Sequence, residues 1–141
     1  MIPVTPASLP ASFAEAALRG VRCTCPRCGE ARLFRKWLKP LERCAVCGVD
    51  WSPQRADDFP AYIAIFVTGH LLAPLIIALS LDFELGPAVM FAILVPLALV
   101  MMLGLLQPSK GAVIAAQWWF GLNGFAKERP ATNPSPKADG E

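Results

Sequence analysis

The sequence contains little of the chemistry on which enzymes usually depend. His70 is the only histidine among 141 residues, so one chain cannot supply two imidazole ligands to a metal or a haem. No nucleophile stands beside a base, and no glycine-rich phosphate loop is present. We therefore expect a non-enzymatic protein with no catalytic residue and no small-molecule substrate.

Charged residues are also scarce, at 17% of the chain against 55% hydrophobic residues, which is apolar for a soluble protein. Residues 61–81 contain no Lys, Arg, Asp or Glu, and residues 88–106 contain no polar side chain. At about 1.5 Å per residue, each segment is long enough to cross a hydrocarbon core of about 30 Å. A chain of this length cannot bury two such helices in a soluble core. We predict an α-helical membrane protein with a transmembrane hairpin at residues 60–107.

Basic residues are missing from the link between the two apolar segments, residues 82–87, which contains two acids. Residues 1–60 carry nine Lys and Arg, and residues 107–141 carry four. The positive-inside rule then places both termini in the cytoplasm. Residues 1–20 lack the charged and apolar regions of a secretory signal, and we expect them to be a flexible lead, in which residues 12–19 could form one or two helical turns. We expect a multi-pass protein of the bacterial inner membrane.

Cysteine is absent outside one short segment, and four of the five cysteines form two C-x-x-C knuckles, each followed by a glycine. The knuckle cysteines are Cys25, Cys28, Cys44 and Cys47. Four thiolates at this spacing predict a closed tetrahedral metal shell that suits zinc or, alternatively, iron. We therefore predict a rubredoxin-like zinc ribbon of β structure at residues 21–59. Metal binding would stabilise it, because so small a module has little core.

The same cysteine pattern also allows a disulfide or a redox pair. Disulfides are disfavoured in the cytoplasm, and a redox C-x-x-C pair normally opens a helix in a βαβ unit, which this sequence lacks. Cys23 remains outside the knuckles. It is either a spare thiol or a fifth, exchangeable metal ligand.

Local patterns predict the remaining segments. Residues 32–39 have the composition of a strand and a turn, with Leu33, Phe34, Trp37 and Leu38 as the core of the ribbon. Pro108 should break the second apolar helix. Residues 108–125 should then form an interfacial amphipathic helix. We expect residues 126–141, which are polar and rich in proline, to be a disordered tail.

Several polar side chains are placed where the membrane would constrain them. His70 lies near the middle of the first apolar segment, four residues before Pro74, which cannot donate a hydrogen bond to the carbonyl of His70. The imidazole is expected to bond a backbone carbonyl locally, to contact a partner, or to bind a metal or a haem shared between chains.

The cytoplasmic ends of the two apolar segments carry further polar and aromatic residues. Asp57 and Asp58 precede the first segment and Lys110 follows the second, so they either form an ion pair at the cytoplasmic face or anchor the helices by solvation. Trp118 and Trp119 are the expected interface anchors.

The order of these features resembles an uncharacterised bacterial membrane family, domain of unknown function nine-eight-three. The similar stretches are CPRCGEARLFRKWLK, RCAVCG, ADDFPAYI, Gly69-His70 and PSKGAVIAAQW, within residues 22–118. The resemblance implies a zinc ribbon on two transmembrane helices. It also implies a gene neighbourhood with haem–copper oxidase subunits and assembly factors. Cys23 and Phe59 depart from the family pattern.

We therefore expect an accessory protein that lies in the lipid bilayer and docks a larger membrane complex, for which a haem–copper oxidase or its assembly factors are the candidates. The alternative is a metal- or redox-handling factor that uses Cys23 with the knuckles. Nucleic-acid binding through the basic residues ranks last, because membrane topology already explains their charge.

Overall fold

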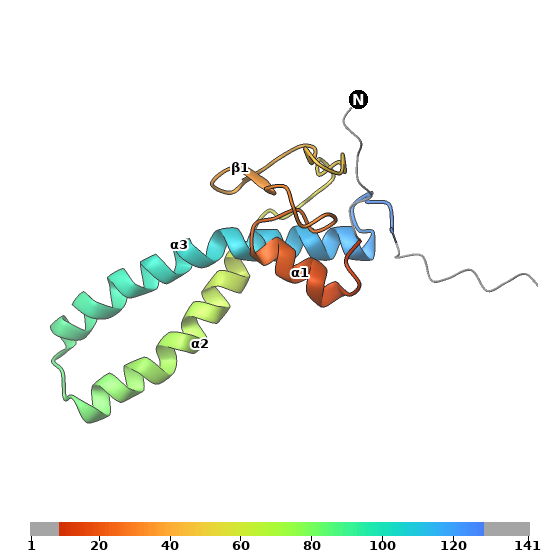
Figure 1. The fold of residues 1–141 in the computed structure, drawn as a ribbon. Helices are drawn as coiled ribbons and strands as arrows, with labels where there is room; N and C mark the ends of the chain where they lie inside the picture. The colour runs from red at the N-terminus through yellow and green to blue at the C-terminus, as the bar shows by residue number, and fades with distance from the viewer. Residues whose placement is uncertain (1–8, 129–141) are drawn as a thin grey trace, which may run out of the picture.

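The structure, a computed structural model, describes residues 9–128. Two long helices, α2 (Phe59–Asp82) and α3 (Pro87–Phe120), form a hairpin at one end of an elongated molecule. Helix α1 (Phe13–Val21) and a small module with strands β1 (Phe34–Lys36) and β2 (Lys39–Pro40) surround the C-terminal half of α3 (Figure 1).

Proline and the adjoining residues set the starts of both long helices. Pro60 and Pro87 each occupy the first turn of their helix, where a missing N–H costs nothing. The predicted apolar segments lie within α2 and α3, and residues 83–86 link the two helices. Both helices are long and apolar enough to cross a membrane.

The apolar side chains of this hairpin are largely uncovered. Leu81, Phe91 and Val100 are 75%, 68% and 70% exposed, respectively. The buried residues of α2 all lie in its first half, and Figure 1 shows the two helices closest near the start of α2 and farther apart towards the link. An exposed apolar surface of this extent marks contact with lipid or another protein.

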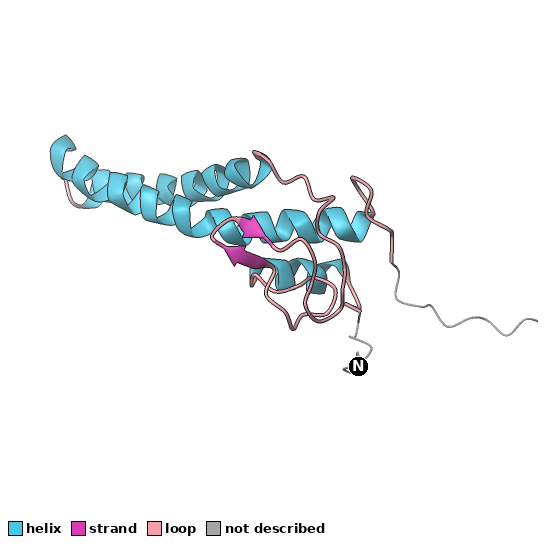
Figure 2. Cartoon of the chain, turned by 90° about the horizontal axis from the view of Figure 1, so that it is seen from above, coloured by secondary structure: helices cyan, strands magenta, loops and turns pink. Residues whose placement is uncertain are grey.

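Helix α3 continues without interruption through Pro108. The predicted break, and with it a separate interfacial helix starting at residue 108, is wrong. A proline inside a helix costs about 3 kcal/mol, but the segment beyond it buries Val113, Ile114 and Trp118. This tertiary packing outweighs the local penalty. The second apolar segment and the ribbon therefore share one helix, as the view in Figure 2 also shows.

Helix α1 corrects the prediction of a flexible lead for residues 9–20. Residues 1–8 and 129–141 lie outside the described residues, and with them most of the predicted disordered tail. Ser12 caps the helix by accepting a hydrogen bond from the backbone N–H of Glu15, and the Glu15 carboxylate accepts one from the N–H of Ala11. These reciprocal bonds are a variant of the capping box. The sequence predicted at most one or two helical turns at residues 12–19, and the structure extends them into a helix that packs against α3.

The contact between α1 and α3 is a backbone contact at Gly20 and Gly111. A Cβ atom built on either glycine would overlap the carbonyl oxygen of the other. Only two glycines permit this approach. It sets Ala16 of α1 against the buried face of α3.

The strand and turn predicted at residues 32–39 are confirmed as the antiparallel β1–β2 hairpin. Leu33 and Phe34 are buried as predicted, but Trp37 is 56% exposed. The large aromatic residue in the core is instead Trp51, which is 1% exposed and packs edge-on against Trp118 with ring centroids 6.4 Å apart. The core of the ribbon is thus completed by α3.

We expect Gly111→Ala to lower the free energy of unfolding by about 1–3 kcal/mol, because the added methyl group forces α1 away from α3. Denaturant unfolding in detergent, followed by tryptophan fluorescence, measures this change through Trp51 and Trp118. Gly104→Ala is the matched control in the same helix, since a Cβ there meets nothing within 4 Å. Equal effects of the two substitutions would contradict the close contact.

Candidate metal centre

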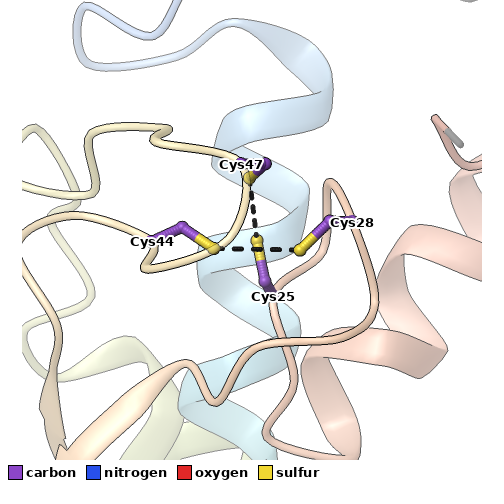
Figure 3. Close-up of side chains that lie close together, drawn as sticks. All are labelled: Cys25, Cys28, Cys44 and Cys47. Carbon is purple, nitrogen blue, oxygen red and sulfur yellow. Dashed lines mark hydrogen bonds between the residues drawn. The ribbon is translucent and has the colours of Figure 1, made fainter. Parts of the chain in front are cut away.

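Four cysteine thiols converge at the centre of the ribbon (Figure 3). The sulfur atoms of Cys25, Cys28, Cys44 and Cys47 all lie within 4.8 Å of one another. Cys25 and Cys47 are 3.7 Å apart, and Cys28 and Cys44 are 3.8 Å apart, so each close pair joins the two knuckles. A tetrahedral ion with metal–sulfur bonds of about 2.3 Å requires sulfur–sulfur edges of about 3.8 Å. The two printed cross-knuckle distances match this edge, and all four thiols are close enough together to hold one metal ion.

Each knuckle is a tight backbone turn closed by its glycine. Gly29 and Gly48 adopt positive φ angles of 74° and 72°. Their N–H groups donate to the carbonyls of Cys25 and Cys44 at 2.7 Å and 3.1 Å. Residues with a side chain rarely adopt this conformation, which explains the glycine after each C-x-x-C.

Burial and backbone hydrogen bonds oppose each other in setting the thiol acidities. Burial raises the pKa of Cys25 and, less strongly, the pKa of Cys47. Burial also acts to raise the pKa of Cys44, but hydrogen bonds from the backbone N–H groups of Cys47 and Val46, together with those from the Cys47 and Cys25 thiols, outweigh it and lower that pKa. A bound cation is what makes four thiolates favourable together in so buried a place.

Arg27 supplies positive charge beside the cluster. Its guanidinium donates to the Glu128 carboxylate at 2.5 Å. This hydrogen bond, together with the nearby sulfur of Cys47, raises the pKa of Arg27. Four thiolates around a dication leave about two negative charges, which Arg27 partly offsets. The same ion pair ties the first knuckle to the segment after α3.

Cys23 lies apart from the four-sulfur cluster. Its thiol points to the carbonyl of Val21 at 3.8 Å, and its backbone has a positive φ of 60°. The structure therefore places Cys23 in the turn after α1, and does not bring it to the metal site as a fifth ligand.

Two polar side chains of α3 attach the ribbon to the long hairpin. The Gln117 amide accepts a hydrogen bond from the N–H of Arg55 at 2.9 Å and donates to the carbonyl of Arg55 at 2.5 Å. Lys110 donates from its ammonium group to the carbonyl of Leu38 at 2.9 Å. Both the segment before α2 and the β1–β2 turn are thus fixed to α3.

The predicted ion pair of Lys110 with Asp57 or Asp58 is wrong. Within residues 9–128, the ion pairs that the structure shows are Glu15–Arg19 and Arg27–Glu128. Because α3 continues through Pro108 alongside the ribbon, the Lys110 side chain reaches the β1–β2 turn.

Trp118 was predicted to anchor the helix at a membrane interface, and this prediction is wrong. Its side chain is 2% exposed and belongs to the core formed with Trp51. Trp119 is partly buried, and its ring lies 6.4 Å from that of Phe13 in α1. Periodicity alone could not show that this end of α3 is covered by protein.

His70 makes a local hydrogen bond in α2, which is the first of the predicted roles. Its Nδ1 lies 2.8 Å from the carbonyl oxygen of Phe66, and the two rings are 4.0 Å apart. The acceptor is therefore the carbonyl oxygen of Phe66. It is not the carbonyl of His70, to which Pro74 cannot donate a hydrogen bond. Contact of His70 with a partner stays a prediction.

Several residues that build the site were missed by sequence reasoning. Arg19 is the clearest: its guanidinium donates to the carbonyl of Arg27 at 3.0 Å, and its own carbonyl accepts from the Thr24 hydroxyl at 2.8 Å. It thereby connects α1 to the first knuckle. A polar residue within PSKGAVIAAQW, such as Gln117, was a usable signal, because a glutamine amid small apolar residues usually has a buried partner.

We expect the purified protein to carry one metal ion per chain and Cys44→Ser to lose it, because a closed shell needs all four sulfurs. Elemental analysis of the protein measures the ratio. Cys23→Ser is the matched control and should keep full occupancy. Retention of metal by Cys44→Ser, or loss from Cys23→Ser, would contradict the assignment of the ligands.

Comparison with known proteins agrees with the features described above. A family model described as a protein of unknown function, DUF983, matches residues 34–118. No curated protein and no solved structure matches the chain. The matched region contains the second knuckle, both apolar segments and Gln117, whereas the first knuckle precedes it. Since the match covers more than half of the chain, the protein belongs to the DUF983 family.

Proposed function

We propose that this protein is a non-enzymatic accessory protein of the bacterial inner membrane, in which a zinc ribbon docks a larger membrane complex. The observation that carries the proposal is that the four-cysteine centre is fixed to the helix that enters the apolar hairpin. Gln117, Lys110 and the Gly20–Gly111 contact hold the ribbon in one orientation. A fixed orientation at the membrane suits a docking surface better than a mobile carrier.

The chemistry of the centre supports a structural role. Four thiolates complete a tetrahedral shell and leave no position for a substrate or a water molecule. We propose zinc as the ion, since it favours this geometry and has no redox chemistry, with iron as the alternative. The position of Cys23 outside the cluster argues against a role in passing metal onward.

The partner we propose is a haem–copper oxidase or one of its assembly factors. The resemblance to the DUF983 family supports this choice through the genes that accompany the family. The exposed apolar faces of α2 and α3 offer contacts to other membrane helices as well as to lipid.

We expect both termini and the ribbon to face the cytoplasm, because the basic residues flank the hairpin on that side. Fusions of a cytoplasm-active fluorescent protein and of alkaline phosphatase, placed after residue 141 and within residues 83–86, report the side directly. Phosphatase activity should appear only with the link fusion. Activity of the C-terminal phosphatase fusion would contradict this orientation.

We expect tagged protein extracted from native membranes to co-purify with oxidase subunits or their assembly factors, as identified by mass spectrometry. Cys44→Ser should abolish this association, because the ribbon would lose the ion that stabilises it. Gln117→Leu should keep its metal but weaken the association, because the segment before α2 is no longer held to α3.

Gln107→Leu is the matched control, since its amide makes no hydrogen bond within the described part of the chain. The docking role would be wrong if Cys44→Ser retained its partners. Recovery of a different complex would leave docking intact but refute the oxidase as the partner.

A further inference from the structure

The turn of the β1–β2 hairpin presents an aromatic ring and positive charge to the outside of the ribbon. Trp37 and Leu38 connect Lys36 to its partner Lys39. The Trp37 side chain is 56% exposed, and the side chains of Arg35, Lys36 and Lys39 are exposed as well. The two strands and the turn contain no acidic residue. A small ribbon that leaves one of its tryptophans uncovered has a surface suited to a partner.

The same turn lies at the end of the apolar hairpin. The Leu38 carbonyl accepts a hydrogen bond from Lys110 at 2.9 Å, and Lys110 follows the apolar residues 88–106 by about one helical turn. Figures 1 and 2 show the β1–β2 hairpin beside α3, with its turn directed towards the apolar part of that helix. If α3 crosses a bilayer, the turn reaches the level of the headgroups.

Two further aromatic residues are exposed at this level. Phe59 and Tyr62, in the first turn of α2, are 62% and 67% exposed. Aromatic side chains gather where a transmembrane helix meets water. Trp37 extends this group from α2 onto the ribbon. It is a candidate for the role of interface anchor that the sequence analysis gave to Trp118.

We propose that the β1–β2 turn, residues 35–39, binds the surface of a bilayer that contains anionic lipids. The Trp37 ring lies among the headgroups, while the basic side chains contact lipid phosphates. Each lysine or arginine near such a surface adds to the attraction, and the indole ring favours the boundary between water and hydrocarbon. The inference rests on the proposed membrane insertion of α2 and α3, and it gives the ribbon a second attachment to the membrane.

The test uses the full-length protein in lipid nanodiscs whose acyl chains carry bromine near the carbonyl end, which quenches nearby tryptophan. The discs contain either phosphatidylcholine alone or a mixture with phosphatidylglycerol. Wild-type emission should be quenched, more strongly in the mixture, and Trp37→Phe should lack this quenched emission. Trp51 and Trp118 are buried in the core and Trp119 packs against Phe13, so the brominated lipid should quench their emission little.

Lys36→Glu should remove most of the additional quenching that phosphatidylglycerol causes, because the reversed charge repels the anionic surface. Lys127→Glu makes the same change in the segment after α3 and should leave the quenching as it is in the wild type. Lys39→Glu repeats the charge test independently. Metal content of each variant confirms that the ribbon remains folded.

Separate measurements distinguish this inference from the proposed function. Protein that resists extraction from membranes by alkaline carbonate, yet shows no quenched Trp37 emission, would overturn the inference while leaving the membrane proposal intact. Extraction by carbonate would overturn both. Loss of co-purification by Lys36→Glu with unchanged quenching would show that the turn docks a protein, and would also overturn the inference.

Discussion

The backbones of α1 and α3 approach each other at Gly20 and Gly111 so closely that neither position has room for a side chain. This contact places the end of α1 on the C-terminal half of α3. Because Arg19 and Thr24 then connect α1 with the first knuckle, the contact also sets where Cys25 and Cys28 lie. A packing constraint between two helices thereby governs the position of a metal site that contains neither glycine.

The two ends of the molecule are stabilised by different forces. In the ribbon the apolar core is small, and Trp51 is covered only because Trp118 and Phe125 pack against it. A bound ion would add the cross-link between knuckles that such a module needs. In the hairpin the exposed apolar side chains are unfavourable in water but favourable in lipid. Helix α3 contributes to both ends of the molecule, and its buried residues all lie between Ser109 and Trp118, in the half that the ribbon and α1 surround.

The sequence was informative wherever local physics decides the structure. The lengths of the apolar segments, the spacing of the cysteines and the glycine after each knuckle follow from helix rise, metal geometry and backbone sterics. The β1–β2 hairpin followed from composition. The errors concern positions where distant segments meet. Pro108 was predicted to break the helix, but the burial of Val113 and Ile114 beyond it stabilises a continuous helix.

The same explanation applies to the side chains at the junction between hairpin and ribbon. Charge alone suggested that Lys110 would pair with Asp57 or Asp58, but its ammonium group lies against the backbone of the β1–β2 turn. Trp118 had the composition of an interface anchor, and burial gave it a role in the core. A periodic pattern shows that a helix has an apolar face, but it cannot identify what covers that face.

Loss of the metal would therefore affect the two ends unequally. Burial disfavours the charged form of Cys25, so the thiols would take up protons and the knuckles would lose the ion that joins them. The ribbon could then separate from α3 and expose Trp118 and Ile114, because its own core is too small to hold it there. The pairing of α2 with α3 involves none of the cysteines and would persist in lipid. The boundary between the two responses lies at Arg55 and Gln117, where the backbone of the ribbon is hydrogen-bonded to the helix that continues into the apolar hairpin.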